Sequence, residues 1–394
     1  MTRRAADVLV VGGGLVGCAL ARALARRGAS VTVAERGRTG EEASGAAAGF
    51  LSPQADFAVD GPLARLGVAS RALYPTWVRA VARESGVDPH WRRRGMLYVA
   101  VSAAEERALA ARVGWQRGLG WRVERVSARR ARALVPGLGP AVRGGVFFPD
   151  DASVDNERLV VAAALAARRA GVTILEGCTV GRVLARGGRV SGVESTHGPL
   201  AAPAVVLAAG AWAAGVALAR GVPRPAVVPV RGQMVVLRGL AGLVDRPLHG
   251  RDGYFAPRGD GRVLVGSTYE HVGFDKRVTA GAVGALLAMA ERLVPATAGA
   301  HVEGVYAGLR PATRDGLPVV GAAPGAAGLW YACGLYRNGI LLAPAIADAV
   351  ADLVTSGTTR WPIEAFSPAR AAARLIRRTR PGAGRARSRD PRRS

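Results

Sequence analysis

A strand, a glycine-rich turn and a helix open the chain, and this order constrains its fold more than any other feature. The valine-rich run Asp7–Val11 predicts a buried strand, Gly12–Gly17 has the pattern G-x-G-x-x-G, and Cys18–Arg27 has apolar residues at helical spacing. A second predicted strand, Ser30–Ala34, ends at Glu35. The sequence therefore predicts a doubly wound α/β domain whose first turn binds the phosphates of a dinucleotide.

Each glycine of this turn has a predicted role. Gly12 makes the tight turn, Gly14 lets the main chain approach a pyrophosphate, and Gly17 lets the helix pack on the strand. Glu35 lies eighteen residues after Gly17 and can accept hydrogen bonds from ribose hydroxyls. An acidic residue at this position disfavours a cofactor that carries a 2′-phosphate.

The strongly basic composition carries less information than its size suggests. The formal net charge is +25, but Lys276 is the one lysine among 54 basic residues, a skew that is typical of a GC-rich genome. Residues 369–394 contain ten arginines and one acid, which predicts a disordered basic tail. A weak contact of this tail with nucleic acid or an anionic membrane is the alternative to a solvated extension.

Cysteine usage and hydropathy indicate a cytoplasmic protein. The three cysteines, Cys18, Cys178 and Cys333, form no C-x-x-C pair and no disulfide framework. The longest apolar runs, such as Val8–Val16, are too short and too rich in glycine to span a membrane. We therefore expect no membrane span and no metal site.

Three later segments carry a more specific signal. Ser44–Gly49 has the pattern S-x-x-A-A-G, Tyr306–Pro318 contains G-x-R-P-x-T-x-D-G-x-P, and Cys333–Pro344 contains Y-R-N-G-I-L-L-A-P. With these motifs the chain resembles the D-amino-acid oxidase family of FAD-dependent oxidoreductases, from about residue 6 to about residue 360. The last motif is most similar to that of the glycine-oxidising members that serve thiamine biosynthesis.

The resemblance implies non-covalent FAD, because the position of Cys333 does not match the cysteine that binds flavin covalently in some members. It also implies which residues contact the cofactor. These are Gly12, Gly14, Leu15, Val16, Gly17, Glu35, Arg36, Ala43, Ser44, Ala48, Gly49, Phe50, Val180, Ala209, Gly210, Leu335, Tyr336, Arg337, Asn338, Gly339, Ile340 and Leu341.

The expected fold class is α/β, with a Rossmann-like FAD-binding domain of the glutathione-reductase type and an inserted α+β substrate domain built on an antiparallel sheet. The FAD-binding domain is expected to be discontinuous and to comprise residues 1–80, 145–225 and 302–360. The substrate domain is expected at 81–144 and 226–301, where Val227–Leu237, Gly253–Pro257 and Arg262–Ser267 alternate or run apolar as strands do.

The resemblance implies oxidation of glycine to glyoxylate, ammonia and hydrogen peroxide, with hydride transfer to flavin N5 and oxygen as the acceptor. Arg310, predicted to lie in a loop, would bind the substrate carboxylate with its planar fork, and Tyr254 would donate a hydrogen bond to the same group. Tyr269 and Arg337 would complete the site, and a tyrosine at position 269 would favour a small substrate.

Two alternatives stay open at this point. One is a D-amino-acid or sarcosine oxidase or dehydrogenase of the same family. The other is a flavin-bearing protein that binds nucleic acid through its basic tail, although no nucleic-acid partner is expected. A homotetramer is a further expectation from the resemblance.

Overall fold

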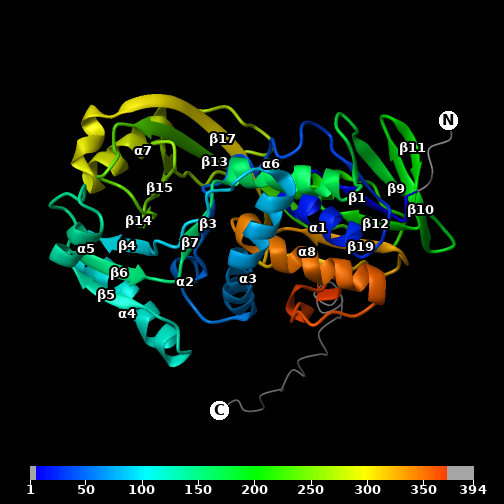
Figure 1. Cartoon of the computed structure of the whole chain (residues 1–394), viewed down its shortest axis with the longest axis horizontal. Helices are drawn as coiled ribbons and strands as arrows, with labels where there is room; N and C mark the ends of the chain where they lie inside the picture. The colour runs from blue at the N-terminus through cyan, green and yellow to red at the C-terminus, as the bar shows by residue number, and fades with distance from the viewer. Residues whose placement is uncertain (1–5, 371–394) are drawn as a thin grey trace, which may run out of the picture.

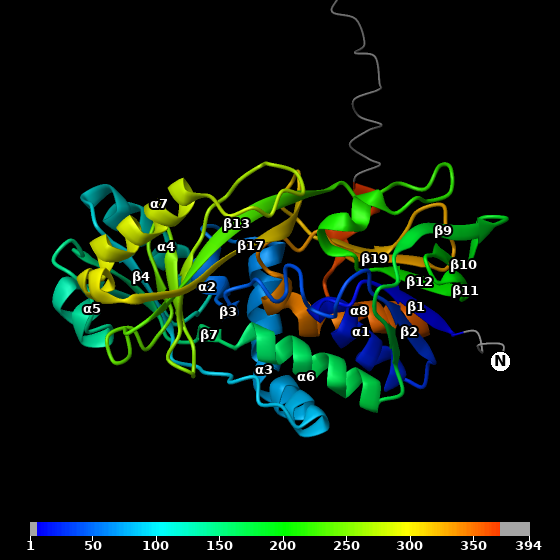
Figure 2. The ribbon, with the colours of Figure 1, turned by 90° about the horizontal axis from the view of Figure 1, so that it is seen from above.

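The computed structural model describes residues 6–370, which form two main sheets at opposite ends of the long axis of the molecule (Figure 1). Residues 371–394 lie outside the described residues, and so does nearly all of the predicted disordered tail at 369–394. The two sheets remain apart when the molecule is seen from above (Figure 2).

The first sheet has six strands in the order β18-β19-β12-β1-β2-β8, and all neighbours pair in parallel except β18 and β19. Its strands are β1 (Val8–Val11), β2 (Val31–Ala34), β8 (Thr173–Leu175), β12 (Ala204–Leu207), β18 (Val319–Ala322) and β19 (Leu329–Cys333). The first strand of the sequence, β1, lies in the interior of this sheet, as in doubly wound dinucleotide-binding domains.

Side chains of β1 alternate between two cores, as strand geometry requires. Val8 and Val10 pack toward a layer of helices, whereas Leu9 and Val11 pack toward a small antiparallel sheet. The helices are α1 (Leu15–Ala25), α3 (Pro62–Ser85), α6 (Asn156–Arg169) and α8 (Gly339–Ser356). The small sheet consists of β9 (Val180–Arg186), β10 (Arg189–Ser195) and β11 (Gly198–Ala201).

Helix α8 packs against α1 and α3 in the helical layer. Pro344 inside α8 has no N–H for the carbonyl of Ile340, and the hydroxyl of Tyr74 on α3 donates to this carbonyl instead. Among the described residues, α8 is the one helix long and apolar enough to cross a membrane by length and composition, but 61% of its apolar window is buried inside the protein. Burial at this level is typical of a core helix.

The second sheet has eight strands in the order β17-β13-β16-β15-β14-β4-β6-β5, and it is antiparallel except where β14 pairs with β4. Its strands are β4 (Met96–Ala100), β5 (Glu124–Ser127), β6 (Gly144–Phe148), β13 (Val227–Arg238), β14 (Leu248–His249), β15 (Tyr254–Pro257), β16 (Val263–Gly266) and β17 (His301–Thr313). Helices α5 (Ala128–Leu134) and α7 (Ala280–Leu293) cover one face, and α4 (Ala103–Gly118) packs on the other.

Short elements connect the two halves. The pair β3 (Phe50–Leu51) and β7 (Ala152–Ser153) lies between the large sheets in Figure 1, next to α2 (Pro53–Asp56). The remaining elements are the 3₁₀ helices η1 (Gly210–Gly215), η2 (Pro295–Gly299) and η3 (Glu364–Phe366).

Two expectations differ from the structure in this region. The prediction that Arg310 lies in a loop is wrong: β17 continues to Thr313, because its pairing with β13 runs from His301 to Thr313 almost without interruption. The strands β6 and β17 also belong to the eight-stranded sheet, whereas the expected boundaries assign 145–148 and 302–313 to the FAD-binding domain. The division into two domains stays a prediction, and we propose it with both strands assigned to the substrate domain.

Candidate active site

The turn between β1 and α1 is closed by backbone contacts that exclude side chains. Gly12 has a φ of +111°, and a Cβ there would lie 2.5 Å from the carbonyl oxygen of Ala208. A Cβ on Gly17 would lie 1.9 Å from the carbonyl oxygen of Gly12. The helix α1 starts after Gly14, has no acid in its first turn, and donates the N–H of Leu15 to Ser44 Oγ at 3.0 Å. Its N-terminus is therefore suited to an anionic group.

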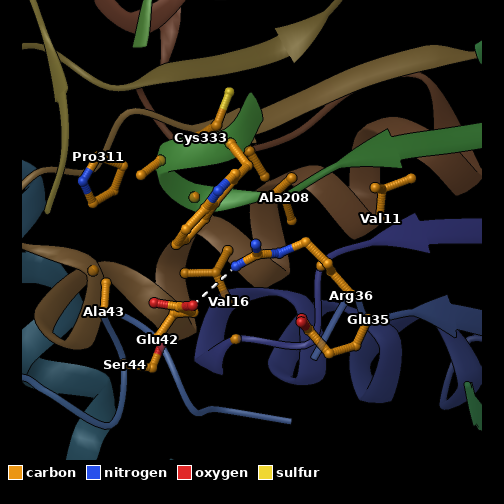
Figure 3. Close-up of a pocket in the computed structure, with 18 of the residues that line it drawn as sticks. Val11, Val16, Glu35, Arg36, Glu42, Ala43, Ser44, Ala208, Pro311 and Cys333 are labelled. Atoms are coloured by element: carbon orange, nitrogen blue, oxygen red, sulfur yellow. Dashed lines mark hydrogen bonds and ion pairs between the residues drawn. The ribbon is translucent and has the colours of Figure 1, made fainter. Parts of the chain in front are cut away.

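A cavity of about 360 Å³ lies beside this turn, at the carboxyl ends of β1 and β2 (Figure 3). Most of the residues predicted to contact the cofactor line it: Gly12, Gly14, Val16, Glu35, Arg36, Ala43, Ser44, Val180, Ala209, Gly210, Leu335, Tyr336, Arg337, Gly339 and Ile340. Ligand binding at this edge of a doubly wound sheet is the general rule for the fold.

Four predicted residues do not line either central cavity. Leu15 and Leu341 are 1% exposed and belong to the apolar core. Gly17 acts through the close packing described above, and Asn338 is the N-cap of α8. These four residues support the cavity rather than form its surface, and the motifs alone do not distinguish the two roles.

Glu35 holds the turn with its carboxylate. It accepts hydrogen bonds from the N–H groups of Gly13, at 2.6 Å, and Gly37, at 2.8 Å. The neighbouring Arg36 lies over the ring of Trp212, 4.0 Å from its centroid, and pairs with Glu42 at 2.9 Å (Figure 3). Trp212 also lines the cavity.

A second cavity of about 90 Å³ adjoins the first. The two share five lining residues: Ala43, Ala47, Tyr336, Arg337 and Ile340. All four residues predicted to act on the substrate, Arg310, Tyr254, Tyr269 and Arg337, line the second cavity, and so do Ala48, Gly49 and Phe50. A small chamber that contains two arginines thus lies next to the larger cavity.

The side chain of Arg310 extends from β17 across Gly232 of the neighbouring strand β13. A Cβ on Gly232 would lie 2.2 Å from the guanidinium of Arg310, so only glycine leaves room for it. The guanidinium donates to Ser267 Oγ at 2.5 Å and to the carbonyl of Thr268 at 3.0 Å. It also lies 4.7 Å from the centroid of the Tyr269 ring. These contacts fix the arginine at the wall of the chamber without neutralising its charge.

Tyr254 is 9% exposed, and burial raises the pKa of its hydroxyl. This hydroxyl lies 3.2 Å from Met234 Sδ, a weak acceptor. At neutral pH the hydroxyl therefore remains protonated and can donate to a better acceptor that enters the chamber.

Arg337 and Tyr269 contact each other in the wall of the same chamber. Arg337 donates to the Tyr269 hydroxyl at 3.1 Å, and its guanidinium lies 3.9 Å from Asp56 Oδ1. The carboxylate of Asp56 is the main cause that raises the pKa of Arg337. Tyr269 is 49% exposed, so its ring lies at the mouth of the chamber.

Sequence reasoning missed Asp56, His249, Met234 and Ser267, which also line the chamber. Burial lowers the pKa of His249, whose Nδ1 lies 2.9 Å from the carbonyl oxygen of Gly250. None of the four belongs to a motif. Asp56 comes from α2 and His249 from β14, two of the shortest elements, and only the tertiary fold brings them to Arg310.

The residues present fit FAD on three observations. The N-terminus of α1, with no acid in its first turn, follows the tight turn at Gly12 and Gly14, which line the cavity. The N-terminus of α8 faces the same cavity through Gly339 and Ile340. Asn338 Oδ1, at this N-terminus, is a buried acceptor without a partner in the described part of the chain. Cys333 also lines the cavity, and burial raises the pKa of its thiol to about 12.

Fold and site together define a dinucleotide-dependent oxidoreductase with a small substrate chamber. Residues 7–353 match the DAO family, described as FAD dependent oxidoreductase, and the chain belongs to this family. The predicted fold class and FAD as cofactor are confirmed.

The relatives extend over most of the chain. A glycine oxidase of Pseudomonas putida is 38% identical over 89% of this chain and 94% of its own length. A bifunctional protein ThiO/ThiG of Synechocystis is 38% identical over 92% of this chain, which spans 54% of that protein. The crystal structure of glycine oxidase from Geobacillus kaustophilus superposes with a TM-score of 0.88 at 36% identity, covering 92% of this chain and 98% of that one.

Proposed function

We propose that the protein catalyses the FAD-dependent oxidative deamination of glycine. Glycine, water and oxygen would become glyoxylate, ammonia and hydrogen peroxide. One observation carries the proposal: a chamber of about 90 Å³, with Arg310 in its wall, adjoins the cavity that fits FAD. The similarity to glycine oxidases of Pseudomonas putida and Geobacillus kaustophilus supports it.

Within the chamber, Arg310 would bind both carboxylate oxygens of the substrate with its planar fork. The protonated hydroxyl of Tyr254 would donate a further hydrogen bond to the same carboxylate. Both groups are held by the eight-stranded sheet, so the carboxylate is bound to a rigid support. When bound, FAD supplies the acceptor for the hydride that leaves the substrate Cα.

The charges in the chamber favour the neutral amine. Arg310 and Arg337 contribute two positive charges, and Asp56 is the one carboxylate among the residues that line this cavity. Nearby positive charge lowers the pKa of a bound ammonium group. Tyr269 at the mouth and Phe50 in the wall limit the room for a side chain on the substrate Cα.

The decisive experiment mixes the purified flavoprotein with glycine in the absence of oxygen and follows the visible spectrum of the flavin. We expect bleaching, followed by peroxide formation when oxygen is admitted. A protein that keeps its flavin colour with glycine but bleaches with sarcosine or a D-amino acid would refute glycine as the substrate. Bleaching by glycine without peroxide formation would refute oxygen as the acceptor.

Three finer points belong to the same proposal. The imine product would supply thiazole formation in thiamine biosynthesis, which the similarity to a protein ThiO/ThiG supports. A cytoplasmic location is consistent with three buried free cysteines. Assembly into a homotetramer would be tested by light scattering of the holoprotein.

A further inference from the structure

The hairpin between β15 and β16 sends one arginine, Arg258, away from its own sheet and under the loop of residues 44–49. The guanidinium of Arg258 donates to the carbonyls of Val154 at 2.9 Å, Ala48 at 3.2 Å and Ala47 at 3.3 Å. It also donates to Oδ1 of Asn156. All these partners are uncharged, so the hydrogen bonds do not cancel the charge of the arginine.

Asn156 continues the same network from the start of α6. It is fully buried, and its Nδ2 donates to the carbonyls of Ser44 at 2.8 Å and Gly45 at 2.7 Å. Arg258 and Asn156 together therefore bind four carbonyls of one short loop. No side chain can replace Gly49 here, because a Cβ would lie 2.1 Å from the carbonyl oxygen of Val154 and 3.0 Å from Arg258.

This loop separates the two cavities. Ala43, Ser44 and Ala47 line the larger cavity, whereas residues 46–50 line the substrate chamber. Because a trans peptide unit is planar, a carbonyl turned toward Arg258 turns the N–H of the same unit the opposite way. The two units that Arg258 binds, 47–48 and 48–49, carry the N–H groups of Ala48 and Gly49.

These two N–H groups have no hydrogen-bond acceptor within residues 6–370. By contrast, the N–H of Gly45 donates to Gly40 O at 2.8 Å and that of Ala46 to Glu42 O at 3.0 Å. A backbone donor without an acceptor in the protein is completed by water or by a ligand. They occur here at the border between the FAD cavity and the chamber.

We propose that Arg258, supported by Asn156, is a positioning residue for the flavin. It fixes the peptide units 47–48 and 48–49 so that their N–H groups face the bound flavin, and its charge stabilises the negative charge of reduced flavin. The inference depends on FAD and not on which amine is oxidised, so it stands or falls apart from the proposed substrate.

The test compares Arg258→Met with Arg262→Met on the same hairpin. Arg262 is the matched control, because it pairs with Asp260 at 2.8 Å and Glu157 at 3.5 Å and, within residues 6–370, donates no hydrogen bond to the loop of residues 44–49. We expect Arg258→Met to raise the dissociation constant for FAD at least tenfold. In the fully loaded protein we expect it to shift the midpoint potential of the flavin to more negative values and to alter its visible spectrum. Arg262→Met should leave all three unchanged.

A second variant keeps the test decisive if Arg258→Met does not fold. Asn156→Asp has the same shape, but its carboxylate cannot donate to the carbonyls of Ser44 and Gly45, and it neutralises Arg258. We expect the same direction of change in affinity and potential. Wild-type affinity and potential in a folded Arg258→Met or Asn156→Asp variant would overturn the proposal, and so would equal changes in Arg262→Met.

Discussion

Arg310 donates its hydrogen bonds to a serine hydroxyl and to backbone carbonyls, with no carboxylate among these acceptors. Its charge is therefore available to an anionic substrate. We expect Arg310→Ala to retain FAD and to lose about 3 kcal/mol or more of transition-state stabilisation, because the substrate carboxylate is left unpaired. Steady-state kinetics with glycine would show this as a fall in kcat/KM of about two orders of magnitude.

Arg314→Ala is the control for this measurement. Arg314 is exposed, lies just past the end of the same strand, and does not line either central cavity. Near-normal turnover in Arg310→Ala, or an equal loss in Arg314→Ala, would contradict the assignment of Arg310 as the carboxylate-binding residue.

Among single residues, the sequence predicted those site residues that belong to contiguous motifs. Arg310, Arg337 and the loop of residues 44–49 each lie in a motif, and the structure gathers them around two adjoining cavities. Asp56 and His249 could not be predicted, because their roles arise only from where α2 and β14 pack. The same holds for Arg258, whose carbonyl partners lie more than 100 residues away in the chain.

At the scale of elements, the junction of β1 and α1 leaves no space for a methyl group. We expect Gly17→Ala to destabilise the fold by about 2 kcal/mol or more and to abolish FAD retention, since the new Cβ would meet the carbonyl oxygen of Gly12 at 1.9 Å. Gly114 inside α4 is the matched control, with no atom within 4 Å of the position of its Cβ. Gly114→Ala should instead stabilise the protein by about 0.5–1 kcal/mol. Thermal melting and the flavin content after gel filtration would measure both effects.

The contact between α1 and α3 predicts a pH dependence of stability. Arg22, 7% exposed, donates to both oxygens of Glu84 at 2.5 and 2.6 Å. These hydrogen bonds lower the pKa of Glu84 from its ordinary value of 4.5. The stabilisation by the Arg22–Glu84 pair is therefore complete above about pH 4.5 and is lost as the pH falls through the lowered pKa of Glu84. We expect Glu84→Gln to cost about 2 kcal/mol near pH 7, because Arg22 keeps a buried charge without a counter-ion.

The measurement is the difference in Tm between the wild type and Glu84→Gln across pH. This difference should be constant near neutral pH and should shrink below about pH 4.5. Glu106→Gln serves as the control, because the Glu106–Arg143 pair is 34% and 54% exposed and contributes little. A difference that does not change in acid would show that the pair does not act as described.

Helices and strands were predictable from the sequence where their apolar residues form a run or recur with the period of one buried face. The predicted strands Asp7–Val11 and Ser30–Ala34 and the predicted helix Cys18–Arg27 match β1, β2 and α1 to within a few residues. The end of β17 was not predictable, because Pro311 and the Asp315–Gly316 dipeptide are typical of turns and loops when the local sequence alone is considered. Pairing with β13 along its whole length extends β17 through this polar stretch.

At the scale of the whole molecule, the two halves meet at the loop of residues 44–49. The strand pair β3–β7 lies there, and Arg258 from the eight-stranded sheet binds the loop that borders the FAD cavity. A hydride must pass between a substrate held by one half and a cofactor held by the other. The network around Arg258 therefore fixes the relative position of the two reacting groups.

Arg370 binds the C-terminal end of the described chain to the turn that follows β17. Arg370 pairs with Asp315 at 3.1 Å and donates to the carbonyl of Leu317 at 2.8 Å. A truncation after Arg370 removes nine arginines and keeps these contacts, so we expect an unchanged Tm, flavin spectrum and kcat/KM. A truncation after Ser367 removes Arg370 as well and should lower Tm by about 2 °C or more. Equal stability of the two truncated proteins would show that Arg370 contributes nothing, and loss of turnover in the longer one would assign residues 371–394 a part in the reaction.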